Sequence, residues 1–176
     1  MTREKEKIRE EEKILEKNLE EEKIVKKEMI LEKEMIRRLI ETAAAQRSRS
    51  YAPYSRYRVG AALLAQDGTV YTGCNIENAA YTPSICAERT AFSKAVSEGE
   101  THFDAICVVG GDENEKIPSG FSTPCGVCRQ VMAEFCDPKT FVIIAATDPE
   151  NYRIYTLEEL LPAGFGPANL VKMQAP

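Results

Sequence analysis

The first fifty residues carry a helical pattern of hydrophobic positions. With each residue set 100° on from the last, most of the Ile, Leu, Val and Met side chains between Ile8 and Ile40 fall on one broad side. The stretch consists mainly of strong helix formers, and neither glycine nor proline occurs before Pro53. We therefore expect a helix that runs to about Arg49, in which residues from about Met35 pack on the domain that follows and the earlier part projects as an imperfect coiled coil.

After Pro53 the pattern changes to short hydrophobic segments separated by turn residues. It predicts strands at Tyr57–Leu64, Thr69–Asn75, Asp104–Val109, Thr140–Ala146 and Arg153–Thr156. It predicts helices at 85–98, capped by Ser84, from Pro124 to about Phe135, and at Leu157–Leu161, capped by Thr156. Strands that alternate with helices indicate an α/β fold, in which one sheet is covered on both faces.

The charged residues divide the chain into two segments. Residues 1–41 hold 12 of the 23 basic and 13 of the 28 acidic residues, whereas every Gly, Pro, Cys, Tyr and Phe lies beyond them. We therefore expect a charged helical extension at residues 1–34 and a catalytic domain at 35–176. The monotony of Glu, Lys and Ile leaves open whether the extension is engineered or natural. We expect it to mediate assembly, the alternative being a solvated helix with no specific role.

Composition excludes several classes of protein. The net charge of −5 argues against a protein that grips nucleic acid through its phosphates. No run of about 18 apolar residues and no secretory signal is evident, so we expect no membrane partner and a cytoplasmic location. In that reducing compartment, metal binding or quiet burial is the expected use of the six cysteines.

Two short clusters, Cys86–Arg89 and Pro124–Arg129, carry the candidate chemistry. Cys125 and Cys128 are three residues apart in a predicted first helical turn, so both sulfurs can point to one side. Cys86 also lies near a helix N-terminus, where partial positive charge favours thiolates. Three protein ligands leave the fourth position of a zinc ion open, which distinguishes a catalytic zinc from a structural one.

Two residues close behind Cys86, Glu88 and Arg89, have expected roles beside the metal. Glu88 would move protons as a buried carboxylate, and Arg89 would offset the net charge of −1 that three thiolates and one Zn²⁺ carry. The only histidine, His102, belongs to neither cluster and is expected in a surface loop. The remaining cysteines are expected to be reduced and packed: Cys74, Cys107 and Cys136.

Residues 51–165 resemble the homotetrameric cytidine deaminase family of zinc enzymes. The motifs that carry the resemblance are Ala52-Pro53-Tyr54-Ser55, Val59–Leu63, Gly73–Ala79, Cys86–Thr90 and Pro124–Gln130. The resemblance implies a three-layer α-β-α mixed sheet and one Zn²⁺ per subunit, held by Cys86, Cys125 and Cys128. It also implies hydrolytic deamination of cytidine and deoxycytidine for pyrimidine salvage, in which zinc supplies hydroxide to attack C4 and Glu88 transfers protons.

The resemblance assigns contacts to the nucleoside as well. Asn75 and Glu77 would bind the ribose hydroxyls, and we expect both side chains on one face of a strand because residues i and i+2 point the same way. The other implied contacts are Tyr57 beside the base or ribose, where family members often carry Phe, backbone groups of Ala87 and Cys125 at the base edge, and Tyr81 and Phe165 reaching the site of a neighbouring subunit. The active sites would then be shared within a homotetramer.

Three alternatives remain open at this point. One is a deaminase of another aminated nucleoside or heterocycle, and a second is a nucleic-acid deaminase, which the acidic charge disfavours. The third is a helical-fusion scaffold in which the N-terminal helices drive a higher assembly and the deaminase is the oligomeric core. The third can hold together with enzymatic activity because the catalytic motifs are intact.

Overall fold

The computed structural model describes residues 31–171. The predicted projecting part of the helix and the assembly surface expected on it lie outside the described residues. Residue contacts divide the chain between Lys33 and Glu34, and the unit that begins at Glu34 contains all the predicted site residues. No helix in the described part of the chain is both long enough and apolar enough to cross a lipid bilayer.

The centre of this unit is a five-stranded mixed sheet. Its strands are β1 (Tyr57–Ala65), β2 (Val70–Cys74), β3 (Phe103–Asp112), β4 (Val142–Asp148) and β5 (Asn151–Thr156). The spatial order is β2-β1-β3-β4-β5, in which β3 and β4 pair parallel and the other neighbours pair antiparallel. β1, β3 and β4 are buried along nearly continuous runs, as expected for strands covered on both faces.

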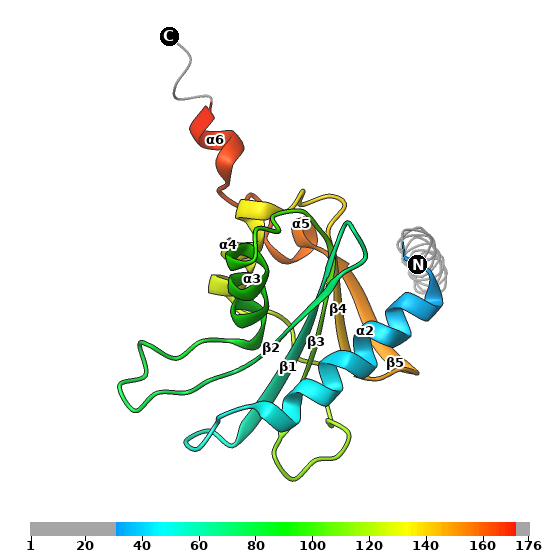
Figure 1. Cartoon of the computed structure of the whole chain (residues 1–176), viewed down its shortest axis with the longest axis vertical. Helices are drawn as coiled ribbons and strands as arrows, with labels where there is room; N and C mark the ends of the chain where they lie inside the picture. Colours follow the sequence, from blue (N-terminus) through cyan, green and yellow to red (C-terminus); the bar gives the residue numbers. More distant parts are fainter. Residues whose placement is uncertain (1–30, 172–176) are drawn as a thin grey trace, which may run out of the picture. The chain divides into compact units, whose positions relative to one another are not determined.

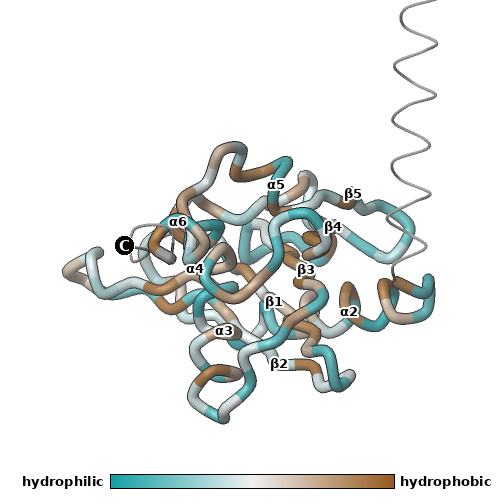
Figure 2. Tube along the Cα trace, turned by 90° about the horizontal axis from the view of Figure 1, so that it is seen from above, coloured by the Kyte–Doolittle hydropathy of each residue, from teal (hydrophilic) through white to brown (hydrophobic). Residues whose placement is uncertain are grey.

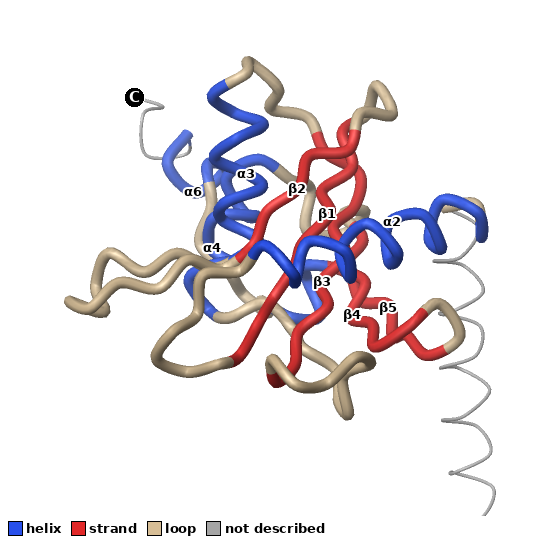
Figure 3. Tube along the Cα trace, turned by 60° about the horizontal axis from the view of Figure 1, so that its bottom comes forward, coloured by secondary structure: helices blue, strands red, loops and turns tan. Residues whose placement is uncertain are grey.

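Helices cover both faces of the sheet. They are α2 (Lys33–Gln46), α3 (Ala87–Ser97), α4 (Gly126–Phe135), α5 (Leu157–Leu160) and α6 (Pro167–Val171), with a 3₁₀ turn at Arg47–Arg49. α2 crosses one face, and α3 and α4 lie side by side on the other (Figures 1 and 3). This arrangement confirms the predicted three-layer α-β-α fold.

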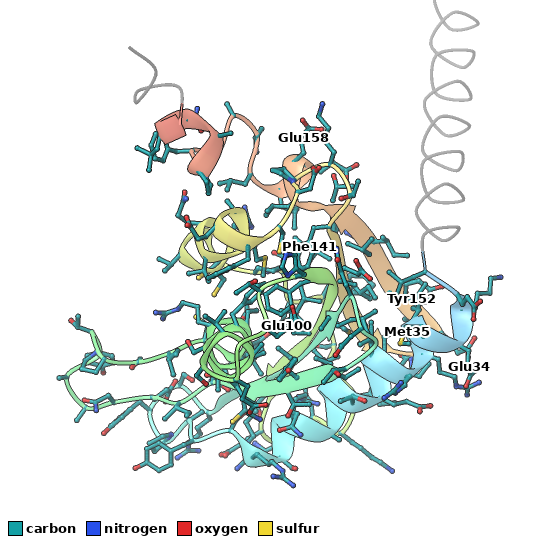
Figure 4. The ribbon with its side chains drawn as sticks, turned by 45° about the horizontal axis from the view of Figure 1, so that its top comes forward. Glu34, Met35, Glu100, Phe141, Tyr152 and Glu158 are labelled. Atoms are coloured by element: carbon teal, nitrogen blue, oxygen red, sulfur yellow. The ribbon has the colours of Figure 1, made fainter. Side chains whose placement is uncertain are left out.

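The core has one part on each face of the sheet. On one side, α2 buries Ile36, Leu39, Ile40 and Ala43, which recur at the spacing of a single helical stripe. On the other side, the strands pack against α3, α4 and α5, and Phe141 lies inside this part of the core (Figure 4). The hydropathy colouring accordingly shows hydrophobic segments on β3 and β4, between the helices (Figure 2).

Two glycines set how closely the helices approach the sheet. A Cβ added at Gly60 of β1 would collide with the Ala43 carbonyl of α2. A Cβ added at Gly73 of β2 would collide with the Ala87 carbonyl at the start of α3. The second contact matters for function because it fixes the N-terminus of α3 on the sheet, next to Cys86.

The structure corrects the predicted start of the helix that covers the first face. Leu31 and Glu32 are not helical, and α2 begins at Lys33, so an unbroken helix through these residues is wrong. The stripe that packs on the sheet begins at Ile36, and tertiary packing supplies most of the stability of a helix in a protein. Burial of this stripe therefore stabilises the helix that begins at Lys33.

The structure also corrects two predicted N-caps and confirms a third. Cys86, not Ser84, is the N-cap of α3, because Ile85 forms an extended bridge with Ile76 and cannot be helical. Cys125 is the N-cap of α4, which therefore begins after the predicted Pro124. Thr156 does cap α5, as predicted, in a reciprocal capping box with Glu159.

Candidate metal centre and active site

The three predicted zinc ligands lie together at the N-termini of α3 and α4. Cys86 and Cys125 are the N-caps of the two helices, and Cys128 lies in the first turn of α4. Their Sγ atoms are all within 4.8 Å of one another, with 3.9 Å between Cys86 and Cys125 and 3.5 Å between Cys125 and Cys128. Tetrahedral zinc with sulfur ligands at about 2.3 Å separates the sulfurs by roughly 3.8 Å. The three cysteines therefore fit one zinc ion.

The environment of these sulfurs favours the thiolate form that zinc requires. Hydrogen bonding from Cys128, and after it from Arg89, lowers the pKa of Cys86 to about 5 although the thiol is half-buried. The same hydrogen bond raises the pKa of Cys128, because Cys128 supplies the shared proton. A cluster of this kind gives up its remaining protons when a metal binds.

Arg89 lies against the sulfur cluster. Its Nη2 donates to the Ser84 carbonyl at 3.1 Å, while its Nε is buried without a hydrogen-bond partner among the described residues. Burial alone would lower the pKa of Arg89, but hydrogen bonds and charge attraction from Cys86 and Cys128 outweigh it and raise the pKa. The positive charge of Arg89 therefore lies beside two of the three sulfurs, as the predicted compensation of the thiolate charge requires.

Glu88 is a buried carboxyl group in the first turn of α3, two residues after Cys86. Only 4% of the residue is exposed, and burial, followed by the charge of Cys86, raises the pKa of Glu88 to about 7. A carboxyl group with a pKa near neutrality can both accept and release a proton at physiological pH.

A cleft of about 450 Å³ opens above Glu88. This volume is in the range of small-molecule sites. Seven of the predicted site residues line it: Tyr57, Asn75, Glu77, Cys86, Ala87, Glu88 and Cys125. The predicted zinc site thus shares one cavity with the nucleoside contacts that were predicted within the same chain.

Sequence reasoning missed one wall of this cleft, formed by Phe121, Ser122 and Thr123 before α4. Arg153 of β5 lies over the Phe121 ring, with its Cζ 4.6 Å from the ring centroid. Ser122 Oγ lies 2.6 Å from the Tyr57 hydroxyl. The available signal was position, since these residues directly precede the Pro124–Arg129 motif.

Asn75 and Glu77 reach the cleft by a different route from the one predicted. β2 ends at Cys74, so the two residues lie beyond the strand on which we expected them, although Ile76 between them forms isolated bridges with Tyr51 and Ile85. The Asn75 amide crosses to β1 instead, where Oδ1 accepts from the Val59 N–H at 2.8 Å and Nδ2 donates to the Tyr57 carbonyl at 2.8 Å. These backbone bonds fix the side chain in the cleft.

Glu77 is held by donors from the segment before β1. It accepts hydrogen bonds from the Tyr54 N–H, the Ser55 N–H and the Ser55 hydroxyl. Hydrogen bonding from Ser55 lowers the pKa of Glu77. The group is therefore an ionised acceptor over the whole physiological range.

Tyr81 and Phe165 do not line the cleft of their own chain. Tyr81 is 73% exposed and has a φ of 57°, and a large side chain adopts this left-handed conformation only under strain. Phe165 is 56% exposed and borders a second cavity of about 550 Å³ beside α4 and α5. Their predicted contacts with a neighbouring subunit stay a prediction.

Known proteins match most of the chain. Cytidine deaminase of Sporosarcina psychrophila is 46% identical over 135 residues, which cover 77% of this chain and 94% of the relative. Cytidine deaminase of Halalkalibacterium halodurans is 49% identical over 127 residues, which cover 72% and 91%.

Solved structures agree with these relatives. The crystal structure of cytidine deaminase from Burkholderia pseudomallei matches with a TM-score of 0.65 at 44% identity and covers 72% of this chain and 96% of that chain. Cytidine deaminase from Mycobacterium tuberculosis matches with a TM-score of 0.60 at 36% identity, covering 73% and 94%. The family model of the cytidine and deoxycytidylate deaminase zinc-binding region matches residues 33–145, and the chain therefore belongs to this family.

Proposed function

We propose that this protein is a zinc-dependent hydrolase that deaminates cytidine and deoxycytidine to uridine and deoxyuridine, with release of ammonia. The observation that carries the proposal is the placement of Glu88, buried beside three cysteines whose sulfurs fit one zinc ion, at a cleft of nucleoside size. A zinc ion bound there would supply a nucleophilic water at neutral pH.

Glu88 would carry the protons of the reaction. Its carboxylate would take a proton from the attacking water, and the resulting acid would protonate N3 of the pyrimidine. The carboxylate would then take the proton of the new C4 hydroxyl and pass it to the amino group, which leaves as ammonia while the C4 carbonyl forms. A pKa of about 7 suits both directions of transfer, because neither protonation state is strongly favoured at neutral pH. Arg89 would support the step indirectly by holding positive charge against the thiolates.

The hydrogen-bonding groups that remain free around the cleft favour a sugar as the second half of the ligand. Asn75 donates one N–H to the Tyr57 carbonyl, and its other N–H, which has no acceptor among residues 31–171, can bind a ligand. Glu77 receives three hydrogen bonds, and its ionised carboxylate can accept one more. One donor and one acceptor side by side suit the hydroxyls of a ribose or deoxyribose.

The proposal includes a homotetramer with shared active sites, in the cytoplasm, where thiols stay reduced. The exposure of Tyr81 and Phe165 supports the proposal, because both large side chains are available for contact with neighbouring subunits. The N-terminal extension would join the helices of several subunits. Deletion of residues 2–30 should then change particle size or thermal stability and leave deamination intact.

The decisive experiment combines zinc analysis with the absorbance change from cytidine to uridine. We expect about one zinc per chain and clear turnover. Glu88→Gln, which is nearly isosteric, should keep the zinc and lower kcat at least a hundredfold, since general acid–base catalysis contributes about 10²–10⁴-fold. A zinc-loaded wild-type protein that leaves cytidine and deoxycytidine unchanged would refute the proposal.

A further inference from the structure

Tyr57, Ser122 and Gly110 form a hydrogen-bonded chain on the wall of the cleft. The Tyr57 hydroxyl lies 2.6 Å from Ser122 Oγ, and Ser122 Oγ donates to the Gly110 carbonyl at 3.2 Å. Tyr57 begins β1, whereas Gly110 lies near the end of the neighbouring strand β3. The chain therefore ties the wall segment before α4 to two strands of the sheet.

The packing at Gly110 shows that this contact requires a glycine. A Cβ added there would lie 2.6 Å from Ser122 Oγ and 3.1 Å from Cε1 of Tyr57. Both side chains occupy the space that any other residue at position 110 would fill. Because Gly110 has no side chain, the hydroxyls of Tyr57 and Ser122 can come within hydrogen-bond distance.

The direction of the hydrogen bonds follows from the chemistry of the groups. The Gly110 carbonyl can only accept, so the single hydrogen of the Ser122 hydroxyl is used there. Ser122 Oγ must then accept from the Tyr57 hydroxyl. Tyr57 has no hydrogen left for a ligand, and its phenol oxygen can only accept.

Tyr57 lies beside Asn75 and Glu77, the two residues proposed above to bind the sugar. Its carbonyl receives the Asn75 amide at 2.8 Å, and its N–H donates to Ser55 Oγ, the hydroxyl that also bonds Glu77. Tyr57 is 43% exposed and lines the cavity together with Asn75 and Glu77. An acceptor in this place suits a donating hydroxyl of the ligand.

We propose that Ser122 is a positioning residue for the sugar of the substrate: by accepting the Tyr57 hydrogen bond, it holds the ring on the wall and presents the phenol oxygen as an acceptor for one sugar hydroxyl. The proposal rests on nucleoside deamination as the function of the cleft. It predicts that Tyr57 and Ser122 act as one unit in substrate binding and contribute little to the chemical step.

The test is steady-state kinetics of zinc-loaded Tyr57→Phe, Ser122→Ala and the double variant, with Ser97→Ala, an exposed serine at the end of α3, as the control. Each single variant should raise KM for cytidine about three- to tenfold, the range of one neutral hydrogen bond, with kcat changed less than twofold. The KM of the double variant should be within twofold of the higher of the two single-variant KM values. Ser122→Thr, which keeps the hydroxyl, should restore KM to within twofold of wild type.

The identity of the donor is tested with cytidine, 2′,3′-dideoxycytidine and 5′-deoxycytidine. The KM increase caused by Tyr57→Phe should disappear for the nucleoside that lacks the donating hydroxyl and persist for the others. The proposal is overturned by an unchanged KM in the single variants, by effects that multiply in the double variant, or by the same increase with all three nucleosides. Wild-type protein that does not deaminate cytidine would instead defeat the proposed function itself.

Discussion

Arg47 is the residue whose loss should most weaken the attachment of the cleft wall. Its side chain is buried in the 3₁₀ turn that follows α2, and Nη2 donates to the carbonyls of Asp112 at 3.0 Å and Glu115 at 3.2 Å. Longer bonds run from Nε to Arg58 O at 3.3 Å and from Nη1 to Lys116 O at 3.4 Å. Burial lowers the pKa of Arg47, and the charge of Glu115 opposes that shift. One guanidinium thus holds the turn from which the chain continues to Phe121 and Ser122.

The cost of Arg47→Ala can be worked out from these bonds. Each of the two shorter hydrogen bonds from a charged donor contributes about 1.5 kcal/mol, and the two longer ones add little. Lost packing of the arginine stem adds about 0.5 kcal/mol. We therefore expect the free energy of unfolding to fall by about 3–4 kcal/mol, which lowers Tm by roughly 10 °C for a domain of this size.

Arg58 provides a matched control, because it reaches the same turn from the surface. Its Nη2 lies 3.4 Å from a Glu113 carboxylate oxygen, and both side chains are partly exposed. A surface pair of this kind contributes less than about 1 kcal/mol, so Arg58→Ala should have a small effect. The assay is urea unfolding of both variants at fixed zinc and protein concentrations. Equal midpoint shifts for the two variants would refute the reasoning.

Three further predictions concern the metal centre and the assembly. Arg89→Gln should lose zinc to a chelator at least tenfold faster than wild type, or turn over cytidine at least tenfold more slowly. Arg37→Gln, on the exposed side of α2, is the control and should change neither rate. Wild-type values of both rates for Arg89→Gln would contradict the role of Arg89. Burial raises the pKa of Glu88 from 4.5 to about 7, so the folded state holds this proton more tightly and loses stability as pH rises through that window. The unfolding free energy of metal-free protein, relative to Glu88→Gln, should fall by about 3 kcal/mol between pH 4.5 and 7, and a flat difference would contradict the shift. Mixed oligomers of Glu88→Gln and Tyr81→Ala should be more active than either parent, because one subunit supplies the tyrosine that the other site lacks; activity no higher than the parents would argue against shared sites.

The metal ligands could be predicted from the sequence because their geometry is local. One helical turn brings Cys125 and Cys128 together, and Cys86, like Cys125, is the N-cap of its helix. Only the meeting of the two helix ends needs tertiary structure. The predicted helix boundaries contain two small errors: the N-cap of α3 is Cys86 and not Ser84, and α4 begins at Gly126 and not at Pro124. Neither error changes which sulfurs lie together.

The cleft wall could not be predicted because its contacts join residues far apart in the sequence. Tyr57 meets Ser122, and Phe121 meets Arg153, through the order of the strands in the sheet. Asn75 and Glu77 both line the cleft, as strand alternation predicts, but they lie beyond the end of β2 at Cys74. Their placement depends on hydrogen bonds to β1 and to the segment before it, for which the local pattern carries no signal.

The metal centre depends on local helix geometry and the cleft wall on long-range contacts, so mutations in the two regions should have different effects. Glu88 and Arg89 are fixed by α3 itself, which Gly73 seats on the sheet, so substitutions there change the chemistry and leave the shape of the cleft. The wall is fixed by Arg47 and by the Tyr57–Ser122 contact, so substitutions there change substrate affinity and stability together. The separation is physical, because the first group acts on charge at the metal and the second acts on the position of a segment.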